Sequence, residues 1–168
     1  DITVTTSADQ TPVAPGKVVS DRIEGDRRMV RFQSTNPILG FFSIQSADYS
    51  ATKRQHDGIE LEIYHHPTHA FNSERMLDAM AVSLDYFQKN FGPYQFDYAR
   101  IIEFPGYASF AQAFAGTVPY SERIGFIANA ADGNDIDYVT YVTAHEYGHQ
   151  YWAHQLISAY MQGGTMLV

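Results

Sequence analysis

Residues 72–93, with the sequence NSERMLDAMAVSLDYFQKNFGP, mark the point where the periodicity of this chain changes from that of strands to that of a helix. Asn72 stands where a helix N-cap is expected, and Gly92 followed by Pro93 stands where a helix ends. We therefore predict a helix between Asn72 and Phe91 whose apolar stripe faces the core rather than a cofactor. The stripe repeats at helical spacing and consists of Met76, Leu77, Met80, Ala81, Leu84, Phe87 and Phe91.

Upstream of this helix the chain reads as β-structure. Between Arg27 and His66 apolar and polar residues alternate, which is the period of half-buried antiparallel strands. Asn36-Pro37 and Asp57-Gly58 indicate turns. From Asp1 to Gly25 the sequence is polar and gives only weak strand signals. The alternating sets are Val30 and Phe32, then Phe42 and Ile44, then Ile59, Leu61 and Ile63.

Downstream of the helix the elements are mixed. We predict strands at Ala99 to Phe104 and at Ile124 to Ala128, and a second helix from about Ile136 to Leu156 with Asp135 or Asp137 as its N-cap. The order of elements indicates an α+β fold. The boundary is expected near Pro67, so that residues 1–66 form a β-rich part and residues 67–168 form the beginning of an α+β domain.

Composition limits the class of protein. The chain has 168 residues, of which 45% are hydrophobic and 14% aromatic, as in a globular protein. A net charge of -8 argues against a nucleic-acid partner, because phosphate contacts need clustered Lys and Arg. The absence of cysteine excludes disulfides and thiolate metal ligands. No apolar run is long enough for a transmembrane helix, and the start at Asp1 leads us to expect a segment of a longer protein.

The stretch His145-Glu146-Tyr147-Gly148-His149 matches H-E-x-x-H. Residues four apart lie about 40° apart around a helix axis, so both imidazoles can reach one Zn²⁺ ion. Glu146 lies about 100° from His145, where it can reach a water on that ion. We predict one zinc ion with His145 and His149 as ligands and Glu146 as general base. The ion would activate the water and stabilise the oxyanion of the attacked carbonyl group.

A third protein ligand is not evident. The metzincin pattern needs a histidine six residues after His149, but His154 follows it by five. On a continuous helix His154 would face away from the metal, and we assign it a supporting or packing role. No Asp or Glu occurs from Gln150 to Val168, so we expect the third ligand to lie beyond this chain.

The remaining histidines carry less information. His65, His66 and His69 flank Pro67, which excludes a helical pair of ligands. A surface loop is the preferred interpretation, with a separate metal site as the alternative. His56 beside Asp57-Gly58 is interpreted as a turn residue.

The chain resembles the aminopeptidase N family of zinc metallopeptidases, the gluzincins, in two stretches: HEYGHQYW and YFQKNFGPYQFDYARIIEFP. Members read H-E-x-x-H-Q-W-[FW] at the zinc helix and F-x-x-x-F-G-x-P-Y-P at the end of an earlier helix. The stretch YASFAQAFAGTVPYSERIGFI is most similar to bacterial metallopeptidase domains attached to transporter permease segments. The resemblance spans about Thr35 to Val168.

The resemblance implies that residues 1–66 are the end of an antiparallel β-sandwich domain and residues 67–168 the first half of a thermolysin-like domain. It implies that Glu122 grips the amino terminus of a peptide substrate. Arg123 departs from the asparagine of the family at the next position, which weakens the case for exopeptidase action. It also implies a glutamate as third zinc ligand, at Val168 or one residue beyond. The parent protein would be the extracytoplasmic part of a bacterial membrane protein.

Two functions follow as hypotheses. The first is zinc-dependent peptide hydrolysis, with aminopeptidase action favoured, in which this chain alone is impaired because a ligand is missing. The alternative is a catalytically degenerate, metallopeptidase-like binding or regulatory module of a membrane transporter.

Overall fold

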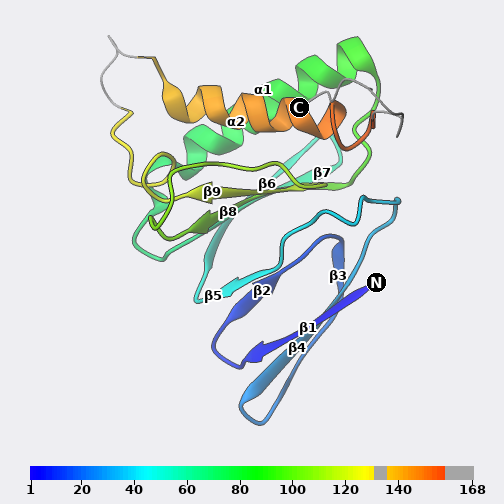
Figure 1. Ribbon diagram of the computed structural model, residues 1–168, viewed down its shortest axis with the longest axis vertical. Coiled ribbons are helices and arrows are strands. Elements are labelled where there is room, and N and C mark those ends of the chain that lie inside the picture. Colours follow the sequence, from blue (N-terminus) through cyan, green and yellow to red (C-terminus); the bar gives the residue numbers. More distant parts are fainter. Residues whose placement is uncertain (131–135, 158–168) are drawn as a thin grey trace, which may run out of the picture.

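A computed structural model describes residues 1–130 and 136–157 (Figure 1). The described residues form three sheets and two α-helices, so the predicted α+β class is confirmed. The elements are β1 (Ile2–Ser7), β2 (Thr11–Val13), β3 (Lys17–Glu24), β4 (Arg27–Gln33), β5 (Gln45–Ala47), β6 (Ser50–His56), β7 (Ile59–His65), the 3-10 turn η1 (Ala70–Asn72), α1 (Ser73–Phe91), β8 (Tyr98–Phe104), β9 (Thr117–Ser121) and α2 (Tyr138–Tyr151).

The N-terminal strands form two small antiparallel sheets, with orders β1-β4-β3 and β2-β5. Their buried apolar cluster is small and consists of Ala14, Val30 and Phe32. Val30 and Phe32 alternate along β4 as predicted, because successive side chains of a strand point to opposite faces. All eight residues of β3 are exposed.

The larger sheet has the order β6-β7-β8-β9. β6 is antiparallel to β7, whereas β7, β8 and β9 are parallel, with α1 crossing between β7 and β8. Both α-helices lie on the same face of this sheet, and the N-terminal strands lie on the other side (Figure 1). The main core fills the space between sheet and helices, and every residue of β8 is buried. Neither described helix combines the length and hydropathy that crossing a bilayer requires.

Arg100 of β8 joins the two parts of the molecule. Its guanidinium is buried and donates to the backbone oxygens of Ala14 and Gly16 at 3.1 and 2.8 Å. The same group forms an ion pair with Glu62 of β7, a buried carboxylate that also contacts Lys53. A buried charge is tolerated when it is paired and hydrogen-bonded, and Arg100 has both the Glu62 carboxylate and two backbone oxygens as partners.

The predicted helix from Asn72 to Phe91 is confirmed as α1, but the role given to Asn72 was wrong. Asn72 occupies the N-cap position, yet its side chain makes no cap hydrogen bond. It instead donates to the backbone oxygens of Gly125, Phe126 and Ala128, and the bond to Gly125 measures 2.7 Å. The buried amide thus holds the loop that follows β9 against the start of α1.

Several strand predictions were wrong. Phe42 and Ile44 belong to no strand, and Ile124 to Ala128 form a turn rather than a strand. β9 occupies residues 117–121 instead, and the polar N-terminus contributes three strands that the sequence barely indicated. These strands are held by backbone pairing with partners distant in the sequence, and such pairing leaves little trace in local hydrophobic periodicity.

The predicted boundary between residues 66 and 67 does not separate the two groups of strands. β6 and β7 precede that boundary but belong to the same sheet as β8 and β9. The change from one sheet system to the other therefore falls between β5 and β6. Strand alternation looks the same on both sides of this point, so the pattern alone could not locate it.

Candidate metal site

Helix α2 carries the H-E-x-x-H motif. It begins at Tyr138 because the side chain of Asp137 accepts a hydrogen bond from the backbone N–H of Thr140 at 3.0 Å. Of the two N-cap candidates, Asp137 is therefore the residue that caps the helix, and Asp135 lies outside the described residues. The helix ends at Tyr151, five residues earlier than predicted, and the chain then bends at Ala153, whose φ is 129°.

The two motif histidines meet on the outer face of α2. The Nε2 atoms of His145 and His149 are 3.2 Å apart, and their ring planes are almost perpendicular at 88°. Two imidazole nitrogens bound to one tetrahedral zinc ion at the usual bond lengths lie about 3.3 Å apart. His145 is exposed and His149 is partly buried. The donor atoms therefore fit a zinc ion that solvent can reach.

The orientation of His149 is fixed through its other ring nitrogen. Nδ1 lies 3.2 Å from the backbone oxygen of Trp152, which can only accept a hydrogen bond. Nδ1 therefore carries the proton, and Nε2 keeps its lone pair for a metal. This arrangement depends on the early end of α2, because Trp152 already has an extended backbone at the helix C-cap.

Glu146 lies behind the histidine pair and is only 6% exposed. Burial raises the pKa of its carboxyl group, although the nearby His145 and His149 and a backbone hydrogen bond from Ala113 act in the opposite direction. A carboxylate with a raised pKa is a better base than one in water, because its pKa is closer to neutral pH. Glu146 is close enough to both histidines for their charges to lower its pKa, and its carboxyl group is buried.

His154 follows the helix end and is buried. Its Nε2 lies 3.0 Å from the backbone oxygen of Ala113, and the described residues provide no partner for its Nδ1. Burial lowers the pKa of the ring, so the neutral form is favoured. His154 thus supports the segment that faces Glu146, and its donated hydrogen bond turns Nε2 away from metal binding.

Gln150 is a site residue that the sequence analysis missed. It is fully buried on α2, and its amide accepts from the N–H of Gly116 at 2.8 Å and donates to the oxygen of Phe114 at 2.9 Å. The segment from Ala111 to Phe114 pairs antiparallel with β9, and Gln150 fastens its end to the motif helix. The glutamine that follows the second histidine in the pattern H-E-x-x-H-Q-W-[FW] was the one sequence feature that could have pointed to Gln150.

Gly116 explains why the segment can turn there. Its φ is +69°, and an added Cβ would come within 2.5 Å of the Tyr98 ring. Glycine alone adopts this backbone and tolerates this approach without strain. Segment 111–116, which we call the edge segment, therefore lies between β9 and the C-terminal half of α2.

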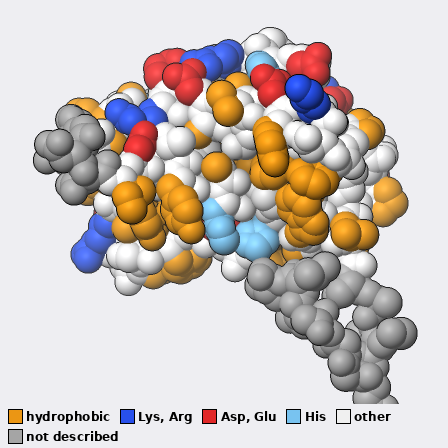
Figure 2. Space-filling view, turned by 90° about the horizontal axis from the view of Figure 1, so that it is seen from above, with side chains coloured by type: hydrophobic (Ala, Val, Ile, Leu, Met, Phe, Trp, Pro, Cys, Tyr) orange, Lys and Arg blue, Asp and Glu red, His pale blue; other side chains and the backbone are white. Residues whose placement is uncertain are grey.

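The surface around the motif is largely apolar. Tyr141 stacks on His145 with ring centroids 6.3 Å apart, and Tyr138 and Tyr141 are both exposed. Figure 2 shows histidine side chains open to solvent on the helix-bearing face, with hydrophobic side chains on either side. Such a surface can contact the apolar parts of a peptide.

Glu122 does not join the motif in the contacts of the described residues. It follows β9, and its Oε1 accepts from the backbone N–H of Gly106 at 2.7 Å. Its Oε2 lies 4.0 Å from Nδ1 of His69. Within residues 1–130 and 136–157, His145 and His149 gather no third His, Asp or Glu into a group that could hold an ion. Val168, where the resemblance allows a third ligand, lies outside the described residues.

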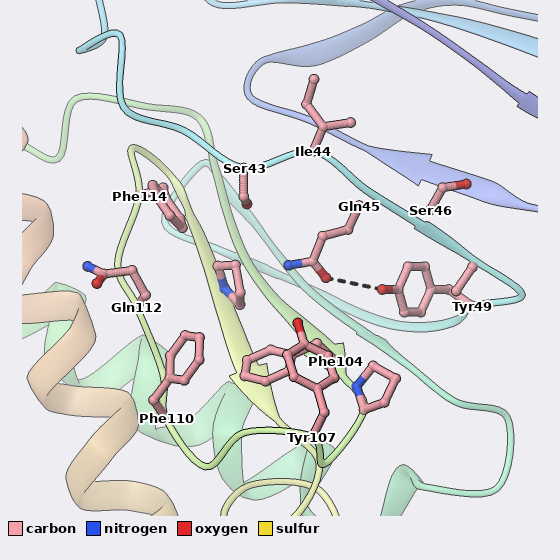
Figure 3. Close-up of a pocket in the computed structure, with 13 residues that line it drawn as sticks. Ser43, Ile44, Gln45, Ser46, Tyr49, Phe104, Tyr107, Phe110, Gln112 and Phe114 are labelled. Carbon is pink, nitrogen blue, oxygen red and sulfur yellow. Dashed lines mark hydrogen bonds between the residues drawn. The ribbon is translucent and has the colours of Figure 1, made fainter.

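A groove of about 490 Å³ lies between the strand β5 region and the edge segment (Figure 3). It is lined by aromatic rings and by polar groups such as Gln45 and Tyr49, which hydrogen-bond to each other at 3.2 Å. None of the three motif residues lines it. This groove and the candidate chemistry are therefore separate.

Comparison of the chain with models of known protein families and with characterised protein sequences finds no match. The functional assignment therefore rests on the motif, its geometry and the resemblance stated above.

Proposed function

We propose that this chain carries part of the active site of a zinc-dependent metallopeptidase of the gluzincin class, with aminopeptidase action favoured. The observation that carries the proposal is the pair of Nε2 atoms 3.2 Å apart on His145 and His149, with a buried Glu146 next to them. A histidine pair and a carboxylate in this order are the elements of metal-assisted peptide hydrolysis.

In the proposed reaction, bound zinc would supply Lewis-acid activation of a water molecule and of the scissile carbonyl group. His145 and His149 would hold the ion, and the Trp152 carbonyl would keep His149 in the required tautomer. Glu146 would accept a proton from the attacking water and return it to the leaving amine. Its burial beside Ala113 keeps bulk water from solvating the carboxylate and so supports the role of base.

The finer fold assignment is also a proposal. A mainly parallel sheet with both helices on one face is what the first half of a thermolysin-like domain would provide, and the antiparallel N-terminal sheets would be the end of a β-sandwich. The role of Glu122 in binding a substrate amine stays a prediction. Its observed contacts are Gly106 and His69, and we do not include it in the proposed machinery.

One observation favours the alternative, a degenerate metallopeptidase-like module of a membrane transporter. The described residues bring two ligands together at the motif, whereas catalytic zinc sites use three protein ligands. With two histidines the ion would be held weakly and hydrolysis by this chain alone would be slow.

The test compares wild type, Glu146→Gln and His145→Ala in the parent protein, with zinc content and hydrolysis of aminoacyl-p-nitroanilides and longer peptides as readouts. We expect Glu146→Gln to retain zinc and to lose at least about 100-fold in kcat, the usual contribution of a general base. His145→Ala should lose both zinc and activity. A zinc-loaded wild type that cleaves none of the peptides would refute the enzyme and favour the module.

A further inference from the structure

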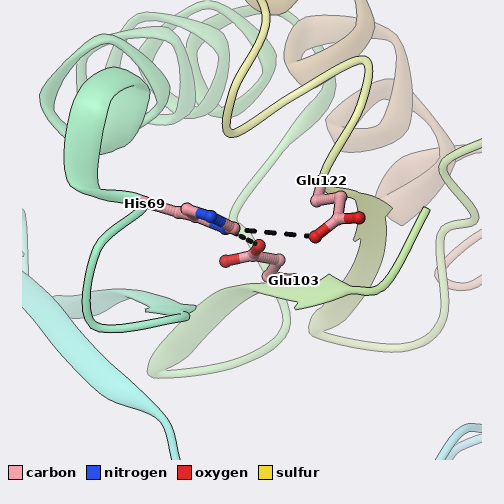
Figure 4. A group of neighbouring side chains, drawn as sticks. All are labelled: His69, Glu103 and Glu122. Carbon is pink, nitrogen blue, oxygen red and sulfur yellow. Dashed lines mark hydrogen bonds and ion pairs between the residues drawn. The ribbon is translucent and has the colours of Figure 1, made fainter.

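We propose a second divalent-cation site, separate from the motif, formed by His69, Glu103 and Glu122. Nδ1 of His69 is 2.5 Å from Oε1 of Glu103 and 4.0 Å from Oε2 of Glu122. One ligand atom from each of the three residues lies within 4.8 Å of the other two (Figure 4). None of the three residues belongs to α2, so this site does not depend on the proposed peptidase function.

The three residues meet because of the sheet topology. β7, β8 and β9 are adjacent and parallel, so their C-terminal ends lie side by side at the same end of the sheet. His69 follows β7, Glu103 is the penultimate residue of β8, and Glu122 comes directly after β9. Crevices outside the carboxyl ends of parallel strands are a preferred place for ligands in open sheets. Figure 4 shows the three side chains pointing toward one another from these places.

Each carboxylate is held through one oxygen by a backbone N–H, so that its other oxygen faces the cluster, and in Glu103 that other oxygen hydrogen-bonds to Nδ1 of His69. Oε2 of Glu103 accepts from the N–H of His66 at 2.6 Å, and Oε1 of Glu122 accepts from the N–H of Gly106 at 2.7 Å. Oε1 of Glu103 and Oε2 of Glu122 then point at His69. Outer hydrogen bonds that orient the ligating atom are a general property of metal sites.

The charge balance also favours a cation. Glu103 is 4% exposed, and among the described residues it forms no ion pair with a Lys or Arg. Of the two other buried glutamates, Glu146 belongs to the motif, and Glu62 is paired with both Lys53 and Arg100. Buried charges in proteins are paired or coordinate metals, and His69 is the only side chain with which Glu103 forms an ion pair in the described structure.

The cluster holds two carboxylates, and the cationic groups near them are few. His66 packs its ring against that of His69 with centroids 4.7 Å apart, and Arg123 lies beside Gly106 next to Glu122. Within the described residues, Arg123 forms no ion pair with Glu122. A divalent ion between the oxygens that face His69 would compensate both carboxylates at once.

The spacing fits an ion of the zinc class. Ligand atoms about 2.0–2.2 Å from a tetrahedral zinc lie about 3.3–3.6 Å apart. His69 Nδ1 lies nearer than this to Oε1 of Glu103, with which it hydrogen-bonds, and farther than this from Oε2 of Glu122, so small side-chain shifts would seat the ion. One imidazole with two carboxylates is a donor set that Zn²⁺ and Mn²⁺ both accept, and water would complete the coordination. Bound there, the ion would tie the turn before α1 to the ends of β8 and β9.

The experiment uses the full chain with His145→Ala and His149→Ala, which removes the motif site and leaves the second site intact. Metal-free protein is titrated with Zn²⁺, and separately with Mn²⁺, against a chromophoric chelator, and the melting temperature is recorded with and without ion. We expect one equivalent of Zn²⁺ and a higher melting temperature with zinc. Adding Glu122→Gln should weaken zinc binding at least about tenfold and abolish the thermal shift.

Glu122→Gln is a suitable probe because its amide oxygen can still accept from Gly106, and because Glu122 is partly exposed. Glu60→Gln and His56→Gln remove a carboxylate and an imidazole elsewhere on the surface and should leave zinc affinity unchanged. Absence of zinc binding in the double alanine variant, or equal affinity after Glu122→Gln and His69→Gln, would overturn the site. If wild type binds one zinc and the double variant none, the proposed peptidase site survives and this one fails.

Discussion

Gln150→Leu tests whether the edge segment is held in place by α2. Leucine has a similar volume, so the main effect is the loss of two hydrogen bonds rather than a cavity. The buried N–H of Gly116 loses the Oε1 acceptor at 2.8 Å, and an unsatisfied buried donor costs about 1–3 kcal/mol. The oxygen of Phe114 keeps a second bond from the N–H of Thr117 at 3.0 Å, so its loss adds about 1 kcal/mol or less.

We therefore expect Gln150→Leu to lower the free energy of unfolding by about 1–4 kcal/mol. Urea unfolding followed by circular dichroism measures this difference. Gln155→Leu is the matched control, because Gln155 is exposed and its side chain donates one hydrogen bond, to the backbone oxygen of Pro93 at 3.1 Å. Its cost should stay within about 0.5 kcal/mol.

Gln150→Glu sharpens the same prediction through its pH dependence. A protonated carboxyl at this buried position can accept from Gly116 and donate to Phe114, whereas the ionised form faces the Phe114 oxygen without a proton. The folded-state pKa of the introduced carboxyl should therefore exceed its unfolded value of about 4.3. The stability of this variant is then greatest below that value and falls as pH rises through the folded pKa. Equal costs for the Gln150→Leu and Gln155→Leu variants, or a pH-independent Gln150→Glu, would refute the reasoning.

Two further predictions concern charges that hold the fold. Arg100→Met should cost about 3–5 kcal/mol in urea unfolding at pH 7, because it leaves the buried Glu62 with one cation fewer. Burial raises the pKa of Glu62, but Arg100 and Lys53 outweigh burial and leave the pKa lowered. The stabilisation from the ionised Glu62 is therefore lost as pH falls through its folded-state pKa, and the stability difference between wild type and Arg100→Met should shrink in acid. A stability difference that stays constant down to pH 3 would contradict this. Asp137→Ala should cost about 1 kcal/mol by removing the cap of α2, whereas Asp137→Asn, which keeps an acceptor for Thr140, should cost less. Burial raises the pKa of Asp137, but its hydrogen bonds with Thr140 and its pairing with Arg75 outweigh burial and leave the pKa lowered. The cost of Asp137→Ala should therefore be full at neutral pH and decline in acid, which calorimetry at pH 3 and 7 checks.

The elements that the sequence predicted well are those fixed by local spacing. α1 shows its apolar stripe and its Gly-Pro end directly, and Ala99 to Phe104 was recognised because a buried strand is a short apolar run. The strands of the polar N-terminus and β9 were missed because pairing with distant partners forms them. The end of α2 was placed five residues late because no glycine or proline marks it.

The sequence by itself determined the pairing of His145 with His149 and the place of Glu146, because the helical period alone brings residues four apart to one face. Only the tertiary structure decided how Glu146 and His154 are buried, because both depend on Ala113 of the edge segment. It also decided that His69, Glu103 and Glu122 meet. These residues lie far apart in the chain, and only the parallel alignment of three strand ends brings their ligand atoms together.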